Sequence, residues 1–253
     1  MAEMTDYRCL AVVEVPADQV SSYDELLCES ASVFLGRGWK LLVASQSADP
    51  YDTGGAPPGL VPKLMQVWEI PDFDSLGQVM AYAADSPTYV EAQAKTVGEL
   101  QNLYVAMRWD SPIGIPETPA KYFMVETLHM VNGQLERDKF GDYMNNAVYT
   151  MYSKYSWEIR FAGNATTGVI NQFVNVWAMN DISNLSAAIT AYRGDPSWSG
   201  AVSRVETSMW TPRSLPAFGT QDGAATAGVA AAGGSTAPAG GGAAPAAPTS
   251  TGG

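Results

Sequence analysis

The segment from residue 172 to residue 198 reads QFVNVWAMNDISNLSAAITAYRGDPSW. Its alternating run from Phe173 to Trp177 predicts a β-strand. The polar pair Asn180-Asp181 then precedes a helical pattern, which ends in a Gly-Asp-Pro-Ser-Trp motif of the kind that stops a helix. The segment therefore predicts one strand followed by one helix. This unit decides the fold because the chain contains it twice.

An earlier copy of the unit occupies residues 65–89 and reads MQVWEIPDFDSLGQVMAYAADSPTY. The two copies align without a gap at a spacing of 109 positions, so that Val67-Trp68 matches Val176-Trp177. Four further matches pair an aspartate, a leucine, a proline and an aromatic residue: Asp72 with Asp181, Leu76 with Leu185, Pro87 with Pro196, and Tyr89 with Trp198. One supersecondary unit is thus used twice.

Strands and helices follow one another in the same order around both copies. In the first copy we expect strands at residues 7–15, 39–45, 63–70 and 100–109, and helices at 23–35, 73–83 and 89–98. In the second copy we expect strands at residues 122–131, 157–162, 170–179 and 202–211, and helices at 138–154 and 182–192. This β-α-β-β-α-β order is that of the ferredoxin-like unit, a four-stranded antiparallel sheet with helices on one face.

Two such units in one chain predict an α+β fold in which tandem ferredoxin-like repeats pack sheet to sheet as a pseudo-dimeric α+β barrel. We assign the first repeat to residues 1–110, a Pro-rich linker to 111–120 and the second repeat to 121–218. The remainder, residues 219–253, is rich in Ala, Gly and Pro and is expected to be disordered, because it cannot bury enough apolar surface. Either a monomer with this core or a homodimer of such chains fits the duplication.

The composition excludes some classes of function. The formal net charge of −12 argues against binding to nucleic acid or to an anionic membrane surface, since both need clustered Lys and Arg. No run of about 20 apolar residues predicts a membrane span, and the acidic N-terminus does not resemble a signal peptide. The two cysteines, Cys9 and Cys28, are expected to be reduced thiols in a cytoplasmic protein.

Strand parity places an amide and a tryptophan of each copy on one face. Gln66 and Trp68 share a face in the first copy, and Phe173, Asn175 and Trp177 share the matching face in the second. We assign this face to the barrel interior. Polar tips in an aromatic-lined space are typical of a pocket for an apolar or aromatic small molecule. The alternative is that the tryptophans are core residues and the amides bond to the backbone.

His129, the only histidine, is the single candidate for acid–base catalysis. One histidine excludes multi-histidine metal sites, and we expect no metal. Glu126 and Arg160 are secondary candidates, although parity puts Glu126 on the face opposite His129. Tyr143, in an aromatic-rich helix, is a further candidate, but its helical stripe is more typical of a core.

The repeated strand–turn–helix motif resembles the signature of the NIPSNAP family. The motif at residues 195–198 (Asp-Pro-Ser-Trp) matches that signature well, whereas residues 86–89 (Ser-Pro-Thr-Tyr) match it less well. The Asn-Gly turn at residues 132–133 is similar to the family's Pro-Gly turn, and residues 15–17 depart from it. The resemblance implies membership of the dimeric α+β barrel superfamily, which includes cofactor-free monooxygenases, cyclases, isomerases and haem-binding enzymes. Fold membership of this kind leaves the reaction open.

Two functional hypotheses follow, with a third behind them. The first is a cofactor-free enzyme of the monooxygenase, cyclase or isomerase type, with an apolar or aromatic substrate in a barrel pocket and either His129 or a tyrosine moving a proton. The second is a non-catalytic, NIPSNAP-like protein that binds a small molecule or docks on a partner. The third is a haem enzyme with His129 as the axial ligand.

Overall fold

The structure, a computed structural model, describes residues 7–47, 61–106, 120–131, 134–167 and 171–219. The first repeat contains, in order, β1 (Tyr7–Glu14), η1 (Ala17–Gln19), α1 (Val20–Glu29), α2 (Ala31–Leu35), β2 (Lys40–Ser47), β3 (Lys63–Ile70), α3 (Phe73–Asp85), α4 (Pro87–Ala94) and β4 (Gly98–Ala106). The second contains β5 (Tyr122–Met130), α5 (Gln134–Tyr155), β6 (Glu158–Ala165), β7 (Gln172–Met179), α6 (Leu185–Arg193), α7 (Pro196–Ala201), β8 (Val202–Pro212) and η2 (Pro216–Phe218). The predicted α+β fold is confirmed, while the linker and tail predictions concern residues that lie almost wholly outside the described ranges.

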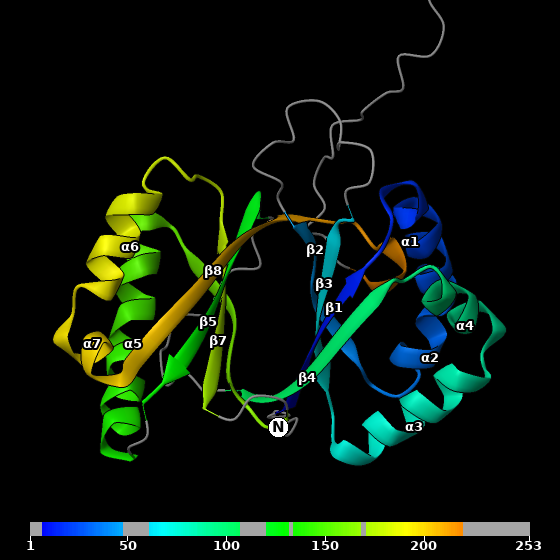
Figure 1. The fold of residues 1–253 in the computed structure, drawn as a ribbon, viewed down its shortest axis with the longest axis horizontal. Helices are drawn as coiled ribbons and strands as arrows, with labels where there is room; N and C mark the ends of the chain where they lie inside the picture. The colour runs from blue at the N-terminus through cyan, green and yellow to red at the C-terminus, as the bar shows by residue number, and fades with distance from the viewer. Residues whose placement is uncertain (1–6, 48–60, 107–119, 132–133, 168–170, 220–253) are drawn as a thin grey trace, which may run out of the picture.

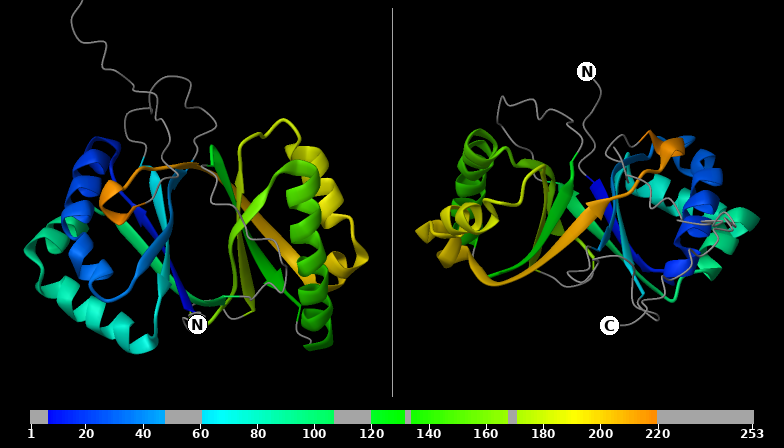
Figure 2. Two further views of the ribbon diagram at one scale, coloured as in Figure 1. Left: turned by 180° about the vertical axis from the view of Figure 1, so that it is seen from behind. Right: turned by 90° about the horizontal axis from the view of Figure 1, so that it is seen from above.

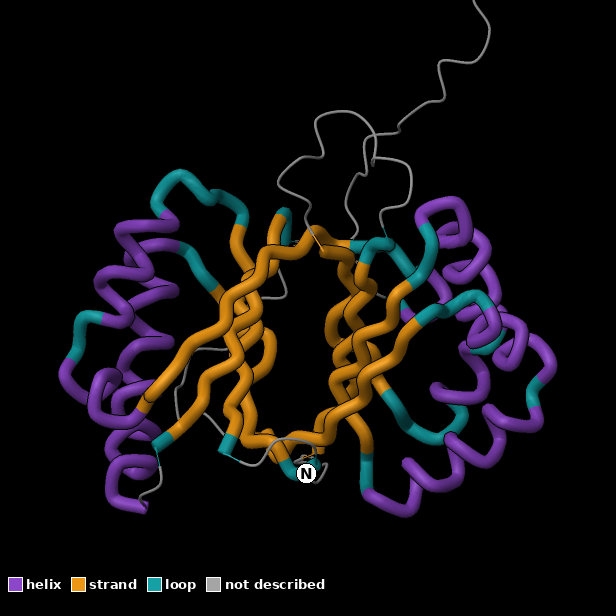
Figure 3. Tube along the Cα trace, in the orientation of Figure 1, coloured by secondary structure: helices purple, strands orange, loops and turns teal. Residues whose placement is uncertain are grey.

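The strands form one closed barrel in the order β1-β3-β2-β8-β5-β7-β6-β4. Each repeat contributes a four-stranded antiparallel sheet, and the two sheets join through β2 with β8 and β4 with β6. Figures 1 and 2 show the two sheets facing each other, and Figure 3 shows all helices on the outside. The pairing removes the exposed edges that each sheet would otherwise present to solvent.

Local capping explains where the helices that follow β3 and β7 begin. Asp72 caps α3 by accepting the Ser75 N–H at 2.6 Å. The matching Asp181 instead accepts the Ser183 N–H at 2.8 Å in a turn, so α6 begins at Leu185, later than predicted. The Asp-Pro-Ser-Trp motif begins the separate short helix α7, with Asp195 as its cap.

Three apolar cores lie in layers across the molecule. One fills the space between the first sheet and helices α1 to α4, and a second fills the equivalent space in the second repeat. The third lies inside the barrel and is mainly aliphatic: Leu10, Val43, Met65, Val67, Ala120, Phe123, Val125, Phe161, Val174, Val176, Ala178 and Trp210. Side chains thus occupy the barrel interior, and the two sheet–helix layers hold Trp39, Trp68, Trp157, Trp177 and Trp198.

The prediction that Gln66, Trp68, Phe173, Asn175 and Trp177 line the barrel interior is wrong. These side chains do share a face, as the alternation indicated, but the face packs against the helices. Alternation fixes which residues lie together and not which side of the sheet they occupy. The intervening aliphatic side chains fit the narrow space between the sheets, and the wider sheet–helix layer takes the tryptophans.

A C-terminal strap, residues 213–218, joins the end of the second repeat to the first. Its Arg213 N–H donates to the Ala44 carbonyl at 2.8 Å, and the buried Arg213 guanidinium lies 2.7 Å from the Asp24 carboxylate on α1. The Phe218 ring lies 5.2 Å from the Trp68 ring between centroids. The strap therefore completes the core of the first repeat. Among the described residues, none of the helices has the length and apolarity that crossing a membrane requires.

The Asp24–Arg213 pair generates a pH-dependent prediction. Burial raises the pKa of the Asp24 carboxyl to about 6, against the opposing charge of Arg213. The folded protein therefore holds this proton more tightly than the unfolded chain, so the free energy of unfolding falls as pH rises from about 4 to about 6, by about 3 kcal/mol. Urea unfolding of the wild type and Asp24→Asn across this range should show that decrease in the wild type alone. Parallel pH profiles of the two proteins would contradict the prediction.

Candidate functional site

A fully buried carboxylate lies at the centre of the second repeat. Glu126 on β5 has no solvent exposure, and its Oε1 accepts a hydrogen bond from Arg193 Nη2 at 2.6 Å. The same Arg193 nitrogen donates to Thr207 Oγ1 on β8 at 2.8 Å. An ionised carboxylate without water is very costly unless it is paired and hydrogen-bonded, and Arg193 supplies both.

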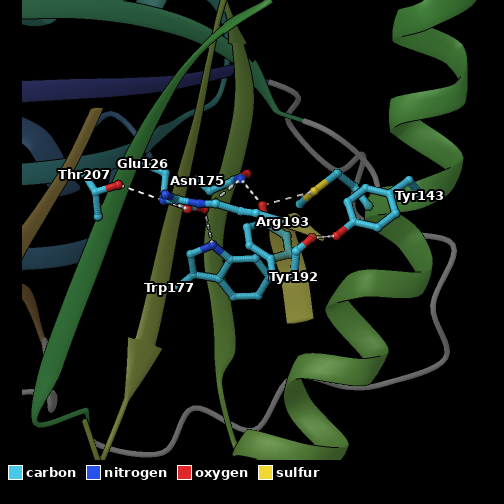
Figure 4. A network of polar contacts seen from close by, with 8 residues as sticks. Glu126, Tyr143, Asn175, Trp177, Tyr192, Arg193 and Thr207 are labelled. Carbon is cyan, nitrogen blue, oxygen red and sulfur yellow. Dashed lines mark hydrogen bonds and ion pairs between the residues drawn. The ribbon is translucent and has the colours of Figure 1, made fainter. Parts of the chain in front are cut away.

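The second oxygen of Glu126 is bonded from the neighbouring strand β7. Trp177 Nε1 donates to Oε2 at 2.9 Å, and Asn175 Nδ2 lies 3.5 Å from the same oxygen. Asn175 Nδ2 also donates to Tyr192 Oη at 2.9 Å, and Tyr192 in turn donates to Met144 Sδ at 3.3 Å. Figure 4 shows these side chains converging between the sheet and the helices.

Strand register brings this network together. Glu126 lies directly opposite Asn175 on β7 and opposite Thr207 on β8, so the three side chains form one row across the sheet. Tyr192 and Arg193 come from the last turn of α6, which packs over this row. Burial raises the pKa of the Tyr192 hydroxyl well above its ordinary value, and the charge of Glu126 acts in the same direction. Tyr192 therefore stays protonated at physiological pH.

The first repeat has the same arrangement without the charges. Trp68 Nε1 donates to Gln66 Oε1 at 3.2 Å, and Gln66 Nε2 donates to Tyr23 Oη at 3.0 Å. Ala11 faces Gln66 in the strand register, in the place where Glu126 faces Asn175. A cavity of about 30 Å³ borders both Ala11 and Gln66, enough for about one water molecule.

This internal comparison bears on the role of Glu126. Position 84, which matches Arg193 at the spacing of the repeat, is also an alanine. The first repeat thus folds around its tryptophan and amide without an ion pair at these two positions, although the Asp24–Arg213 pair is buried elsewhere in its core. Replacing a buried ion pair by apolar residues is often neutral for stability. The Glu126–Arg193 pair is therefore a candidate functional feature of the second repeat.

A groove of about 490 Å³ lies beside the network, between α5 and the α6–α7 turn. The Tyr143 hydroxyl donates to the Tyr192 carbonyl, and the two rings stack with centroids 6.2 Å apart. Burial raises the pKa of the Tyr143 hydroxyl above its ordinary value. The lining residues come from both helical walls: Lys139, Asp142, Tyr143, Asn146, Ala147, Thr150, Met151, Ala191, Tyr192, Asp195 and Ser197. Tyr192 thus belongs both to the buried network and to the groove.

The other predicted site residues lie apart from this groove. His129 is on the opposite face of β5 from Glu126, as parity indicated, and its Nε2 lies 3.1 Å from Glu206 Oε1 on β8. Arg160 forms a buried ion pair with Glu158 at 3.2 Å. Within the described part of the chain, no group of three or more His, Cys, Asp or Glu side chains is placed to hold a metal ion.

Sequence reasoning missed Arg193 as the partner of Glu126. A signal was present, because the alignment of the repeats matches Arg193 with an alanine. Arg193 and the matching alanine stand three positions before the shared proline, and this difference between the repeats is overlooked when only their similarities are compared. Tyr143 was a secondary candidate, and the structure brings it to the groove.

Comparison with known proteins shows the fold only. No family model and no curated protein matches the chain. A chlorite dismutase variant from Candidatus Nitrospira defluvii superposes with a TM-score of 0.57 at 12% identity, covering 86% of this chain and 95% of that one. A proposed monooxygenase from Lactobacillus acidophilus NCFM gives 0.51 at 11% identity, covering 81% and 92%. A haem-binding protein from Thermus thermophilus gives 0.52 at 10% identity, covering 87% and 96%. The chain therefore shares their barrel fold, and the NIPSNAP resemblance stays an interpretation.

The described residues do not fit a histidine-ligated haem. Such a haem needs its axial histidine to face an apolar slot. His129 is paired with Glu206, and neither the 490 Å³ groove nor the 30 Å³ cavity is lined by it. In the second repeat the layer between sheet and helices is occupied by buried rings, including Phe140, Trp157 and Trp177.

Removing one partner of the Glu126–Arg193 pair should be costly. Glu126→Ala leaves a largely buried guanidinium without its counter-charge, and we expect a loss of about 3–5 kcal/mol in the free energy of unfolding. Glu126→Ala with Arg193→Ala reproduces the alanines of the first repeat and should lose less than the sum of the single variants, by about 2 kcal/mol. Chemical denaturation measures all three. The exposed Glu14–Lys63 pair, at 3.4 Å, is the control and should show coupling below about 1 kcal/mol. Additive losses at Glu126 and Arg193 would refute the coupling.

A hemin titration tests the fit of haem directly. We expect that hemin added to the protein at equal concentration gives no Soret band of a histidine-coordinated haem, because His129 faces no slot. Absorption spectra of the wild type and His129→Ala should therefore coincide. A coordinated Soret band that disappears in His129→Ala would show this reading to be mistaken.

Proposed function

We propose that this chain is a haem-independent α+β barrel protein that binds an apolar or aromatic small molecule in the groove between α5 and the α6–α7 turn. The observation that supports it best is the difference between the two repeats. The second repeat combines a ligand-sized groove of about 490 Å³ with a buried ion pair beside it. In the first repeat, the positions equivalent to Glu126 and Arg193 are alanines, and the cavity that borders Ala11, between the sheet and the helices, measures about 30 Å³. Small-molecule sites typically occupy several hundred cubic ångströms.

The lining of the groove supports an aromatic ligand. Tyr143 contributes a partly exposed ring to the lining, and this ring stacks on the buried Tyr192. Tyr192 in turn packs on the buried Trp198, with 4.7 Å between the ring centroids. Aromatic walls favour flat apolar ligands, and a few polar groups between them orient the ligand. Asn146 and Thr150 provide such groups along α5. The expected ligand class is therefore retained, and its position moves from the barrel interior to the helical layer.

The buried network would give the groove a fixed wall. Tyr192 is held at its hydroxyl by Asn175 and at its carbonyl by Tyr143, and the adjacent Arg193 is held by Glu126. A wall whose side chains are already ordered binds a ligand with a smaller loss of conformational entropy. This role requires no direct contact between ligand and the carboxylate of Glu126.

Cofactor-free catalysis of the monooxygenase, cyclase or isomerase type is the second candidate. One observation favours it, because the Tyr143 hydroxyl and the carboxylates of Asp142 and Asp195 border one groove. It ranks second because Glu126 has no exposure and because His129, the proton carrier expected from the sequence, does not line the groove. Non-catalytic binding requires only contact between the ligand and the residues that line the groove, and no proton transfer.

The position of the site can be tested with 3-phenylpropan-1-ol as a neutral aromatic probe. We expect saturation-transfer NMR to detect binding to the wild type. Thr150→Trp, which places a large ring in the groove, should weaken binding at least about fivefold, because one methylene of lost contact already costs about 0.8 kcal/mol. Ser21→Trp, on an exposed position of α1 in the first repeat, is the matched control and should bind as the wild type does. Equal binding by Thr150→Trp, or no binding to the wild type, would rule out the groove as the site.

A further inference from the structure

We propose that the groove selects organic cations, so that its ligand is an aromatic or aryl-alkyl amine rather than a carboxylate. This inference rests on the proposed function of the groove and adds the charge of the ligand. It starts from the ionisable residues of the lining, which are Lys139, Asp142 and Asp195. Two carboxylates face one ammonium group. The excess of negative charge favours a positive ligand.

The negative charge acts where the aromatic rings are. After burial, the next influences on the Tyr143 hydroxyl are the charges of Asp195 and Glu126, and both raise its pKa. Lys139 does not offset them there; it is an exposed residue nearer the N-terminal end of α5. The aromatic end of the groove is therefore electronegative. The partly exposed ring of Tyr143 adds a weak attraction for a cation.

Asp195 is held in position by the backbone. Its Oδ1 accepts the Ser197 N–H at 2.7 Å as the cap of α7, which keeps the carboxylate between the two helical walls. A fixed carboxylate interacts with a bound ion at a smaller entropic cost than a mobile one does. Asp142, on α5, faces the same groove from the other wall.

The same charges disfavour anions. An arylcarboxylate of equal size would bring its charge next to Asp142 and Asp195 without a matching cation at the aromatic end. Arg193, the guanidinium of the network, bonds through Nη2 to Glu126 at 2.6 Å and to Thr207 at 2.8 Å, so its charge is already balanced by the Glu126 carboxylate. The side chains that line the groove therefore favour a cationic ligand over an anionic one.

Three ligands of nearly equal size test the proposal: 3-phenylpropan-1-amine, 3-phenylpropan-1-ol and 3-phenylpropanoate. We expect calorimetric titration at pH 7 and low salt to show the amine binding about tenfold more tightly than the carboxylate, with the alcohol between them. At about 0.5 M salt the preference should fall, because the lining is open to solvent and screened. Asp195→Asn should reduce the preference to about threefold. Asparagine caps a helix about as well as aspartate, so this variant should fold normally.

Controls separate this proposal from the one on which it rests. Asp18→Asn removes an exposed carboxylate of the first repeat and should leave the amine preference unchanged. Binding of the carboxylate as tightly as the amine, or an unchanged preference in Asp195→Asn together with Asp142→Asn, would overturn the charge selection while the groove itself remained the site. If none of the three ligands binds, or if Thr150→Trp affects none of them, the proposed function fails and the charge selection fails with it.

Discussion

A carboxylate that has no contact with water depends on hydrogen-bond donors that stay in place. Glu126 obtains them from two other elements: Arg193 at the end of α6, and Trp177 and Asn175 on β7. Because each donor is lost if its element shifts, the carboxylate fixes the end of α6 against the sheet. That position sets Tyr192, which forms part of the groove wall. The fully buried carboxylate of Glu126 therefore helps to fix the shape of the groove.

Closure of the barrel explains why this site lies among the helices. Pairing β2 with β8 and β4 with β6 brings the two sheets face to face, and aliphatic side chains such as Val67 and Val176 occupy the space between them. The tryptophans and amides of the repeat then face outward, where the helices leave a wider layer. In the first repeat, the C-terminal strap adds Phe218 to that layer. The second repeat has no such addition among the described residues, and its groove lies between α5 and α7.

The fold follows from the sequence because the repeat and its strand–helix order are local patterns. The groups of residues that share a face were also predictable, since side chains alternate along a strand. Which face became the barrel interior depends on the volume that the other repeat leaves free, and no local pattern contains that information. Arg193 was not predicted as the partner of Glu126 for a similar reason. Arg193 is 67 positions away, and only the packing of α6 over β5 and β7 brings the two side chains together.

The duplication also serves as a physical control for the role of the charges. Gln66, Trp68 and Tyr23 form a neutral hydrogen-bonded chain in the first repeat, and Asn175, Trp177 and Tyr192 occupy the same layer in the second. The features that both repeats share, which are the amide, the tryptophan and the tyrosine, are those that the fold requires. The Glu126–Arg193 pair and the groove with its two carboxylates belong to the second repeat. The first repeat has alanines at the matching positions 11 and 84, and its own buried pair, Asp24–Arg213, joins α1 to the C-terminal strap instead. Replacing a buried ion pair by apolar residues is often neutral for stability, and the first repeat has alanines at the positions of Glu126 and Arg193. The pair is therefore better explained by the groove wall that it fixes than by the barrel that both repeats build.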